Sequence, residues 1–302
     1  MKRLHISRKI YLPLLVLALV LAAGLAYKQF WYKSVKPAGL DSKYVSFGGG
    51  YLFSVPANYI ANGIVMPGVT IVYPEASPPK DGQSLNDLYS NGTVAVQPIG
   101  ELKDDNPEAF NAYVKDVLAA DLRKTFEGAT DLRPAEQKNV VAAEIFALGE
   151  GGKRLRANYA INFTQPVLVA ALDYSEAFKI VEFTVEDLKK SSLKSDIDQA
   201  AQATKEIAQK LQKQNSAELT KNATTKFQNQ MTEEQLTDTL NKSSQNLLRP
   251  INIVGGLYDG KFFVAQLVFE AKTGAEQPTS GILSLQKVGK TWKLDGFQLP
   301  QS

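Results

Sequence analysis

The chain has 302 residues, with 34 Lys and Arg, 31 Asp and Glu, and a formal net charge of +3. It has no cysteine and a single histidine, His5, which excludes disulfides, thiol catalysis and thiolate metal sites and leaves the rest of the chain without a histidine base or zinc ligand. Seven basic residues and no acid lie in residues 1–40, so the remainder has 27 basic and 31 acidic residues, a balance of −4 that argues against a nucleic-acid partner. We expect no cofactor and no metal site.

An uncharged apolar run near the N-terminus sets the organisation of the chain. Ile10–Tyr27 contains no charged side chain. At about 1.5 Å per residue, a helix of this length reaches roughly 27 Å, close to the thickness of a hydrocarbon core. The run therefore predicts a single transmembrane helix over residues 10–27, after a cytoplasmic tail of residues 1–9 and before a linker of residues 28–40.

Basic and aromatic residues flank the predicted helix. Aromatic rings at a membrane interface bury their bodies and keep a polar edge in water, whereas basic residues favour the cytoplasmic side. Four basic residues precede the run and three follow it in the linker. This bias favours a cell-membrane protein with a cytoplasmic N-terminus and an extracytoplasmic bulk. The residues expected at the membrane interface are Arg8, Lys9, Tyr27, Lys28, Phe30, Trp31, Tyr32 and Lys33.

A cleavable signal peptide is the alternative interpretation of the same run. Gly24-Leu25-Ala26 places small residues where a signal peptidase reads the chain. Cleavage after Ala26 would release a secreted protein. The run is longer than the ~7–15 apolar residues of a signal core, which favours a retained anchor.

Residues 41–213 are typical of an α+β domain with an antiparallel sheet. Two apolar segments around Gly48-Gly49-Gly50 predict a strand hairpin. Asn106-Pro107 predicts a helix start, and the apolar stripe from Ile197 to Leu211 predicts a closing helix. The strands predicted in this domain cover residues 44–47, 51–56, 69–73, 94–99, 140–148, 153–163, 167–172 and 178–185.

The order of these elements resembles the PsbP-like fold. The likeness rests on an early strand reading FSVPANY (53–59), a helix in mid-domain, a run of antiparallel strands, the segment FKIVEFTVE (178–186) and a long closing helix. It covers about 170 residues. The resemblance implies a non-enzymatic binding domain, and it carries over no functional residue.

Residues 215–302 predict a second domain of helices followed by a strand meander. A helix is expected from Ser216 through Phe227, and Thr232 with Gln235 forms a capping box that opens another. Strands are expected over residues 251–257, 261–271, 281–288 and 291–299. Gly289-Lys290-Thr291 resembles the end of a phosphate-binding loop, but Ser284 stands where that loop needs glycine, so we interpret it as a hairpin turn.

The last hairpin resembles that of nuclear transport factor 2-like (cystatin-like) domains, through Gly289, Trp292, Lys293, Gly296 and Phe297. This resemblance implies a cone in which helices lie across a curved sheet. Enzymatic members commonly use a histidine or aspartate there; we interpret Asp295 as a turn or surface acid. The residues expected to line the cone are Phe227, Leu236, Phe263, Leu267, Trp292 and Phe297.

The sequence thus predicts a membrane-anchored, extracytoplasmic binding or scaffold protein that is not an enzyme. Its partners would be the membrane and a protein of the bacterial envelope. One alternative is a small-ligand binder or carboxylate-based enzyme that uses the cone. The other is a secreted protein released by cleavage at Ala26.

Overall fold

The computed structural model describes residues 42–66, 68–80, 83, 88, 91–98, 129–134, 140–146, 154–160, 167–172, 175–271 and 277–300. Its strands are β1 (Lys43–Ser46), β2 (Tyr51–Ser54), β3 (Tyr59–Met66), β4 (Val69–Pro74), β5 (Val94–Pro98), β6 (Ala129–Pro134), β7 (Val140–Phe146), β8 (Arg154–Ala160), β9 (Val167–Leu172), β10 (Glu186–Asp187), β11 (Ile251–Tyr258), β12 (Phe262–Phe269), β13 (Thr279–Val288) and β14 (Thr291–Gln298). Its helices are α5 (Glu176–Thr184), α6 (Lys194–Gln212), α7 (Ser216–Lys221), α8 (Thr225–Gln230), α9 (Glu233–Lys242) and α10 (Ser244–Leu247).

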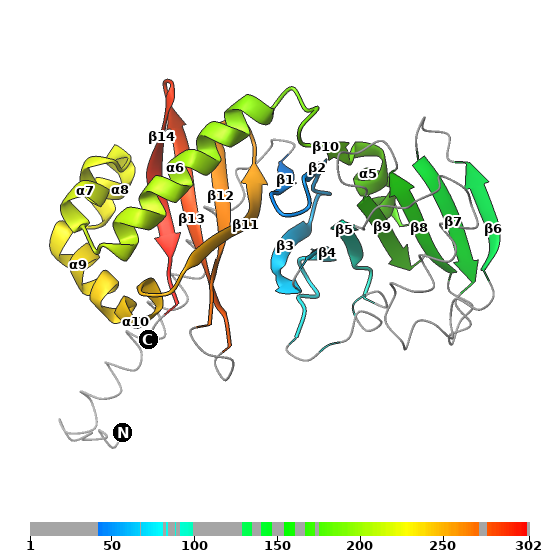
Figure 1. Ribbon diagram of the computed structural model, residues 1–302, viewed down its shortest axis with the longest axis horizontal. Coiled ribbons are helices and arrows are strands. Elements are labelled where there is room, and N and C mark those ends of the chain that lie inside the picture. The colour runs from blue at the N-terminus through cyan, green and yellow to red at the C-terminus, as the bar shows by residue number, and fades with distance from the viewer. Residues whose placement is uncertain are drawn as a thin grey trace, which may run out of the picture. The chain divides into compact units, whose positions relative to one another are not determined.

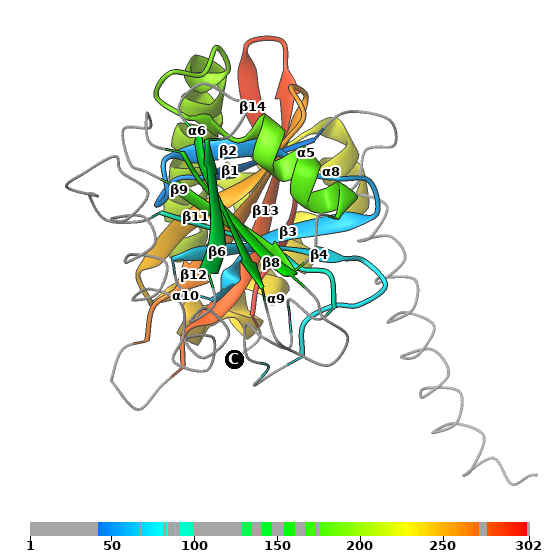
Figure 2. The ribbon, with the colours of Figure 1, turned by 90° about the vertical axis from the view of Figure 1, so that its right-hand side faces the viewer.

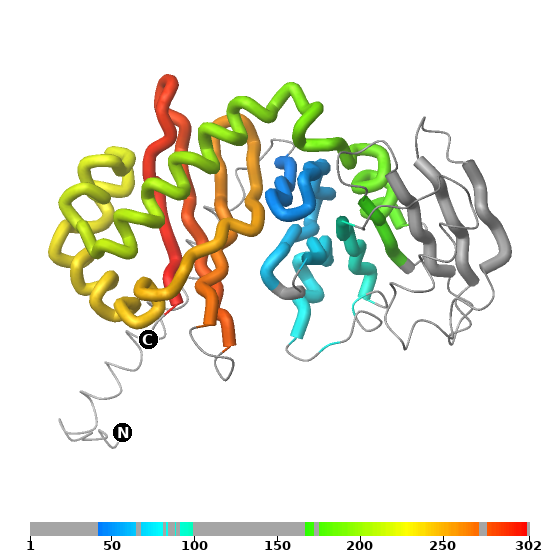
Figure 3. Tube along the Cα trace, viewed as in Figure 1, coloured from blue at the N-terminus to red at the C-terminus, as the bar shows by residue number. Residues whose placement is uncertain are grey.

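The strands form two antiparallel sheets, which confirms the α+β class (Figure 1). Sheet A has the order β10-β2-β1-β11-β12-β13-β14, and sheet B has the order β3-β4-β5-β9-β8-β7-β6. The described part of the chain starts in sheet A, crosses to sheet B through β3 and returns through α5 and β10 to α6 and β11 (Figure 3). Sheet A therefore combines strands from both ends of the described chain.

The hairpin β1–β2 is buried on both of its faces. Val45 pairs with Leu52, and both side chains lie in the core that also contains the buried face of α6. Tyr44 pairs with Phe53, and both lie in a second core with valines of sheet B. Burial of each such side chain contributes roughly 1.5–3 kcal/mol. Because both faces are covered, this hairpin is apolar at successive positions instead of alternating.

The predicted domain boundary at residues 213–215 does not separate the two sheets, because sheet A contains strands from both sides of it. β1 pairs with β11 in the register Lys43↔Tyr258 to Ser46↔Gly255, so a strand expected in the first domain belongs to the sheet of the second. The closing helix α6 also packs on β11–β14, as Figure 1 shows. Its buried residues Ile197, Ala200, Ile207, Ala208 and Leu211 confirm the predicted apolar stripe except for Ala201, which was also expected in it and is only half-buried. Local patterns identified these elements correctly but carry no information on their partners.

The predicted strand 178–185 is wrong, because this segment is helix α5. Ser175 caps it by accepting a hydrogen bond from the Phe178 N–H at 3.1 Å, and Glu176 lies in its first turn. Ala177, Phe178 and Val181 then face the core that contains sheet B. Figure 2 shows α5 beside the strands of this sheet. A short apolar run fits both periods, and the cap decides for the helix.

The helix expected from Ser216 through Phe227 is two short helices, α7 and α8. The chain between them bonds to the edge of β14: the Thr224 N–H donates to the Leu294 C=O at 2.8 Å, and the Leu294 N–H donates to the Asn222 C=O at 3.1 Å. Thr224 then caps α8 through the Phe227 N–H. These bonds to β14 take the place of helical ones.

Other local predictions are confirmed. The capping box of Thr232 and Gln235 opens α9. Gly289, at φ +64°, lies in the turn between β13 and β14, which confirms the hairpin interpretation. The strands predicted at 69–73, 94–99, 140–148, 153–163, 167–172 and in the last meander are β4, β5, β7, β8, β9 and β11–β14. The strands β3, β6 and β10 and the helix α10 were not predicted.

The predicted membrane helix 10–27, the tail 1–9, the linker 28–40 and the helix starting at Asn106-Pro107 lie outside the described residues. Within the part of the chain that the structure describes, no helix combines the length and the apolar character needed to cross a membrane.

Candidate functional site

A cleft of about 950 Å³ lies beside β11, between sheet A and the β3–β4 hairpin. Its lining comes from the β1–β2 turn, the β3–β4 hairpin, the exposed side of α6, the first half of β11 and the start of β13. Among the described lining residues, Asp198 and Lys205 of α6 are the charged ones. The cleft is therefore an apolar and uncharged polar surface with one acid and one base on its helical wall.

The first half of β11 forms one side of this cleft with an open backbone edge. β1 covers Gly255–Tyr258 of β11 and ends at Ser46, after which only the Phe47 N–H reaches back, to the Val254 C=O at 3.2 Å. The turn through Gly50, at φ +67°, then carries the chain away into β2. Ile251–Ile253 consequently have no strand partner on this side among the described residues.

The hydrogen-bond phase shows which backbone groups face the open edge. Ile251 pairs with Phe269, and the Pro250 C=O accepts from the Glu270 N–H at 3.0 Å. In an antiparallel pair, the backbone groups of alternate residues point to the same side. Because the Pro250 C=O points toward β12, the N–H and C=O of Asn252 do so too, whereas those of Ile251 and Ile253 point to the opposite side. The N–H and C=O groups of Ile251 and Ile253 therefore point away from β12, in the plane of the sheet, toward the open edge.

Apolar side chains form the walls beside the open edge. Ile64 and Val69 come from the β3–β4 hairpin, and Val268 comes from β12. Phe47 closes one end, packed against the core of sheet A with its ring 6.0 Å from that of Phe263. Gly68, at φ +75°, lies in the hairpin turn between Met66 and Val69.

The helical wall carries the charges of the cleft. Asp198 forms an ion pair with Lys194 one turn earlier on α6, and Gln202 donates to Glu206. Lys205 has no ion pair among the described residues. The uncompensated charge on this wall is therefore positive.

Gln266 of β12 fixes the β3 wall to sheet A. Its Oε1 accepts from the Tyr44 hydroxyl and from the Gly63 N–H, each at 2.9 Å, and its Nε2 donates to the Ala61 C=O at 3.1 Å. Burial, followed by the nearby Tyr51, raises the pKa of Tyr44 far above its usual value. Tyr44 therefore stays neutral and serves as a donor.

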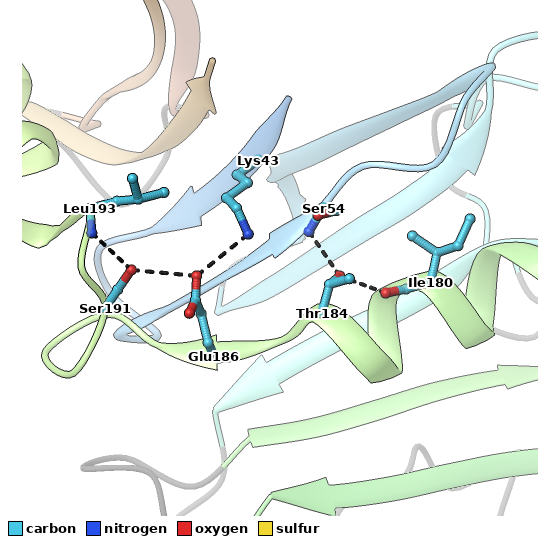
Figure 4. A network of polar contacts seen from close by, with 7 residues as sticks. All are labelled: Lys43, Ser54, Ile180, Thr184, Glu186, Ser191 and Leu193. Carbon is cyan, nitrogen blue, oxygen red and sulfur yellow. Dashed lines mark hydrogen bonds and ion pairs between the residues drawn. The ribbon is translucent and has the colours of Figure 1, made fainter. Parts of the chain in front are cut away.

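A polar network on the other side of β1 holds the segment between α5 and α6 (Figure 4). The Lys43 ammonium and the Ser191 hydroxyl both contact Glu186 Oε1, at 3.5 and 3.4 Å. The Ser54 N–H donates to the Thr184 hydroxyl at 2.9 Å. These contacts fasten α5 and β10 to the β1–β2 hairpin and so stabilise its position beside β11.

A second titratable cluster joins α6 to sheet A. The Tyr258 hydroxyl donates to Asp196 Oδ2 at 2.6 Å, and Lys287 Nζ lies 2.5 Å from Asp196 Oδ1 and 5.8 Å from the centre of the Trp292 ring. Burial, with the bond to Asp196, raises the pKa of Tyr258. This arrangement anchors the first turn of α6, where a carboxylate is favoured by the helix dipole.

The side chains predicted to line a cone lie in the core of sheet A instead. Phe227, Leu236, Phe263, Leu267 and Trp292 are buried members of this core, and Phe297 packs against it. None of the six lines the cleft beside β11. Phe227 and Phe297 contact each other with ring centres 5.9 Å apart. The apolar residues chosen for the cone lining therefore serve as packing.

Asp295 is not the surface acid that the sequence suggested. Its side chain is 4% exposed, and it accepts from the Thr224 hydroxyl at 2.8 Å and contacts Lys226 Nζ at 3.4 Å. Thr224 also caps α8 through its hydroxyl oxygen. Asp295 thus fixes the start of α8 to β14.

The residues predicted for the membrane interface, Arg8, Lys9, Tyr27, Lys28, Phe30, Trp31, Tyr32 and Lys33, lie outside the described residues. The cleft at β11 was not predicted from the sequence. Two local signals were present: the triple glycine after β1 and Pro250 before β11 both mark strand ends. They are the features from which an incomplete pairing of β1 with β11 could have been inferred.

No protein-family model and no curated protein matches the chain. A solved structure of the cyanobacterial PsbP protein CyanoP from Synechocystis sp. PCC 6803 is similar at 14% identity and a TM-score of 0.33, over 50% of this chain and 96% of CyanoP. The Ran-binding protein Mog1p of Saccharomyces cerevisiae is similar at 11% identity and a TM-score of 0.32, over 49% of this chain and 96% of Mog1p. About half of the chain is thus similar to a PsbP structure, while the likeness to nuclear transport factor 2 stays a prediction.

Proposed function

We propose that this chain is a non-catalytic binding protein that holds a protein partner in the cleft beside β11. The observation that carries the proposal is the lining of the cleft, which brings Phe47, Ile64, Val69 and Val268 around a strand edge. Apolar concave surfaces with a few polar groups are the usual form of binding sites. The volume of about 950 Å³ is at the upper end of the range of ligand sites and is large enough for a peptide segment.

The positions of the titratable side chains support a binding role. Asp196, Tyr258 and Lys287 join α6 to sheet A, and Asp295 joins α8 to β14. Each of these groups has a bond that stabilises the fold. The cleft itself has Asp198 and Lys205, on the exposed side of α6, as its described charges. Such a lining favours recognition over proton transfer.

We also propose that residues 10–27 anchor the chain and place the cleft on the extracytoplasmic side, as the apolar run and its flanking charges predict. The partner would then be a protein of the cell envelope. A reporter enzyme that is active only outside the cytoplasm, fused after Ser302, tests the orientation. We expect this fusion to be active. Signal from a fused reporter that works only inside the cell would contradict this part of the proposal.

Site-specific photo-crosslinking in living cells tests the binding role. The full chain carries the crosslinker at Ile64, in the cleft, or at Val288, an apolar position that is 44% exposed and does not line the cleft. We expect a discrete crosslinked partner from Ile64 and none from Val288. The same products from both positions, or a lone monomer from both at native abundance, would contradict the proposed function.

A further inference from the structure

We propose that the occupant of the cleft is an extended segment of a partner polypeptide that adds to sheet A as a strand along Ile251–Val254. This inference rests on the proposed binding function and specifies its chemistry. It starts from the incomplete pairing of β11, whose second half is covered by β1 while its first half is open. An added strand would lie in line with β1, on the other side of the turn that begins at Phe47.

The open edge presents hydrogen-bonding groups at the spacing of a strand. The N–H and C=O groups of Ile251 and Ile253 point away from β12, which follows from the bond between Pro250 and Glu270. Two alternating residues on an incoming strand provide the complementary groups. An extended backbone satisfies all four groups at once, which is how an added strand gains affinity at an exposed sheet edge.

The walls determine which side chains the added strand should carry. Successive side chains of a strand point to opposite faces of the sheet. Those on one face would meet Ile64, Val69 and Val268, and those on the other face would meet α6 at Ala201 and Lys205. We therefore expect apolar residues at alternate positions of the segment.

Charge complementarity adds an acidic residue to this pattern. Asp198 is already paired with Lys194, whereas Lys205 has no ion pair in the described part of the chain. A carboxylate on the α6 side of the segment would neutralise Lys205. The expected occupant is an extended segment with alternating apolar residues and an acid between two of them.

The walls argue against a second copy of this chain as the occupant. In each copy the open edge lies between α6 and the β3–β4 hairpin, both of which line the cleft. Two edges flanked in this way cannot approach to the ~4.8 Å spacing of paired strands, because their walls would collide first. A single extended segment meets no such obstacle.

Amide hydrogen exchange on the full chain in detergent tests strand addition. Peptides are selected from a random library for binding to the full chain, and competition with the Ile64 crosslink identifies those in the cleft. On saturation, we expect exchange at the Ile251 and Ile253 amides to slow about tenfold or more. The Asn252 amide, which already bonds to β12, serves as the internal control and should not change.

Modified peptides provide a second test that leaves the protein unaltered. N-methylation of the bound peptide, one amide at a time, should weaken binding about tenfold at alternate residues and leave the intervening ones unaffected. Lys205→Glu should weaken acidic peptides about fivefold, while Lys221→Glu, on α7 and outside the cleft, should not.

The outcomes separate this inference from the proposed function. A discrete Ile64 crosslink with peptides that bind without protecting Ile251 and Ile253 would overturn strand addition and leave the binding role intact. A concentration-dependent dimer that protects the same amides would also overturn it, in favour of a second copy. Absence of any cleft-bound peptide together with absence of the crosslink would overturn both.

Discussion

Gln266→Leu tests whether one side chain fastens the β3 wall of the cleft to sheet A. Gln266 is 7% exposed and lies on β12, with Tyr44 of β1 and Ala61 and Gly63 of β3 as its three hydrogen-bond partners. Leucine has a similar volume, so it removes the bonds with little change in packing. The substitution therefore isolates the polar link between the two sheets.

The expected cost follows from the groups that lose their partner. A buried polar group left without a hydrogen bond costs about 1–3 kcal/mol. The Tyr44 hydroxyl and the Ala61 C=O belong to fully buried residues, whereas Gly63 is partly exposed and its N–H regains water. We therefore expect a loss of about 3–5 kcal/mol, a large share of the ~5–15 kcal/mol that stabilises a typical domain.

Urea unfolding of the full chain in mild detergent measures this loss. Gln298→Leu is the matched control, since Gln298 is an exposed glutamine on β14 of the same sheet, and it should change the unfolding free energy by less than about 0.5 kcal/mol. Tyr44→Phe removes one of the three bonds and should cost about 1 kcal/mol. A loss below about 1 kcal/mol for Gln266→Leu would refute the reasoning, because the sheets would then be held by apolar packing alone.

Three further predictions concern stability. Burial raises the pKa of Tyr51 from 10.0 to about 12. The free energy of unfolding should therefore be unaffected by this group below pH ~10 and should fall by about 3 kcal/mol as the pH rises through about 12. Unfolding titrations should show this alkaline slope, and Tyr51→Phe should make it shallower without abolishing it, because the raised pKa values of Tyr44 and Tyr258 add to the same slope. Gly255→Ala places a Cβ 2.4 Å from a backbone oxygen of β1 and should cost more than about 2 kcal/mol in thermal unfolding, whereas Gly296→Ala, with its nearest neighbour at 3.9 Å, should be nearly neutral. Asp295→Ala should cost about 2 kcal/mol, since it leaves the buried Thr224 O–H without an acceptor.

Each of these predictions has an outcome that contradicts it. An unchanged alkaline slope in Tyr51→Phe would show that other groups cause it. Equal effects of Gly255→Ala and Gly296→Ala would mean that β1 shifts freely on β11. For Asp295→Ala, the control is Lys226→Ala: Lys226 is half-exposed, so its loss should cost less than about 1 kcal/mol, and a larger loss there would assign the stability to the ion pair.

Sequence reasoning identified elements whose signals are local. The capping box of Thr232 and Gln235, the turn at Gly289 and the apolar stripe of α6 all involve residues close in the chain, so their geometry follows from nearby side chains. The segment 178–185 failed because its apolar residues fit both a strand and a helix, and the cap at Ser175 decided between them.

Only the tertiary structure decided how these elements combine. The pairing of β1 with β11 joins Ser46 to Gly255, and nothing in either segment specifies the other as its partner. Strand pairing is chosen by which apolar faces can be buried together, and this depends on the whole chain. The same pairing ends at Ser46 and leaves Ile251–Ile253 without a strand partner among the described residues. The candidate site therefore exists because β1 is too short to pair with the whole of β11. The sequence by itself determined the local elements and predicted the anchor, whereas the sheet edge and its cleft exist only in the folded chain.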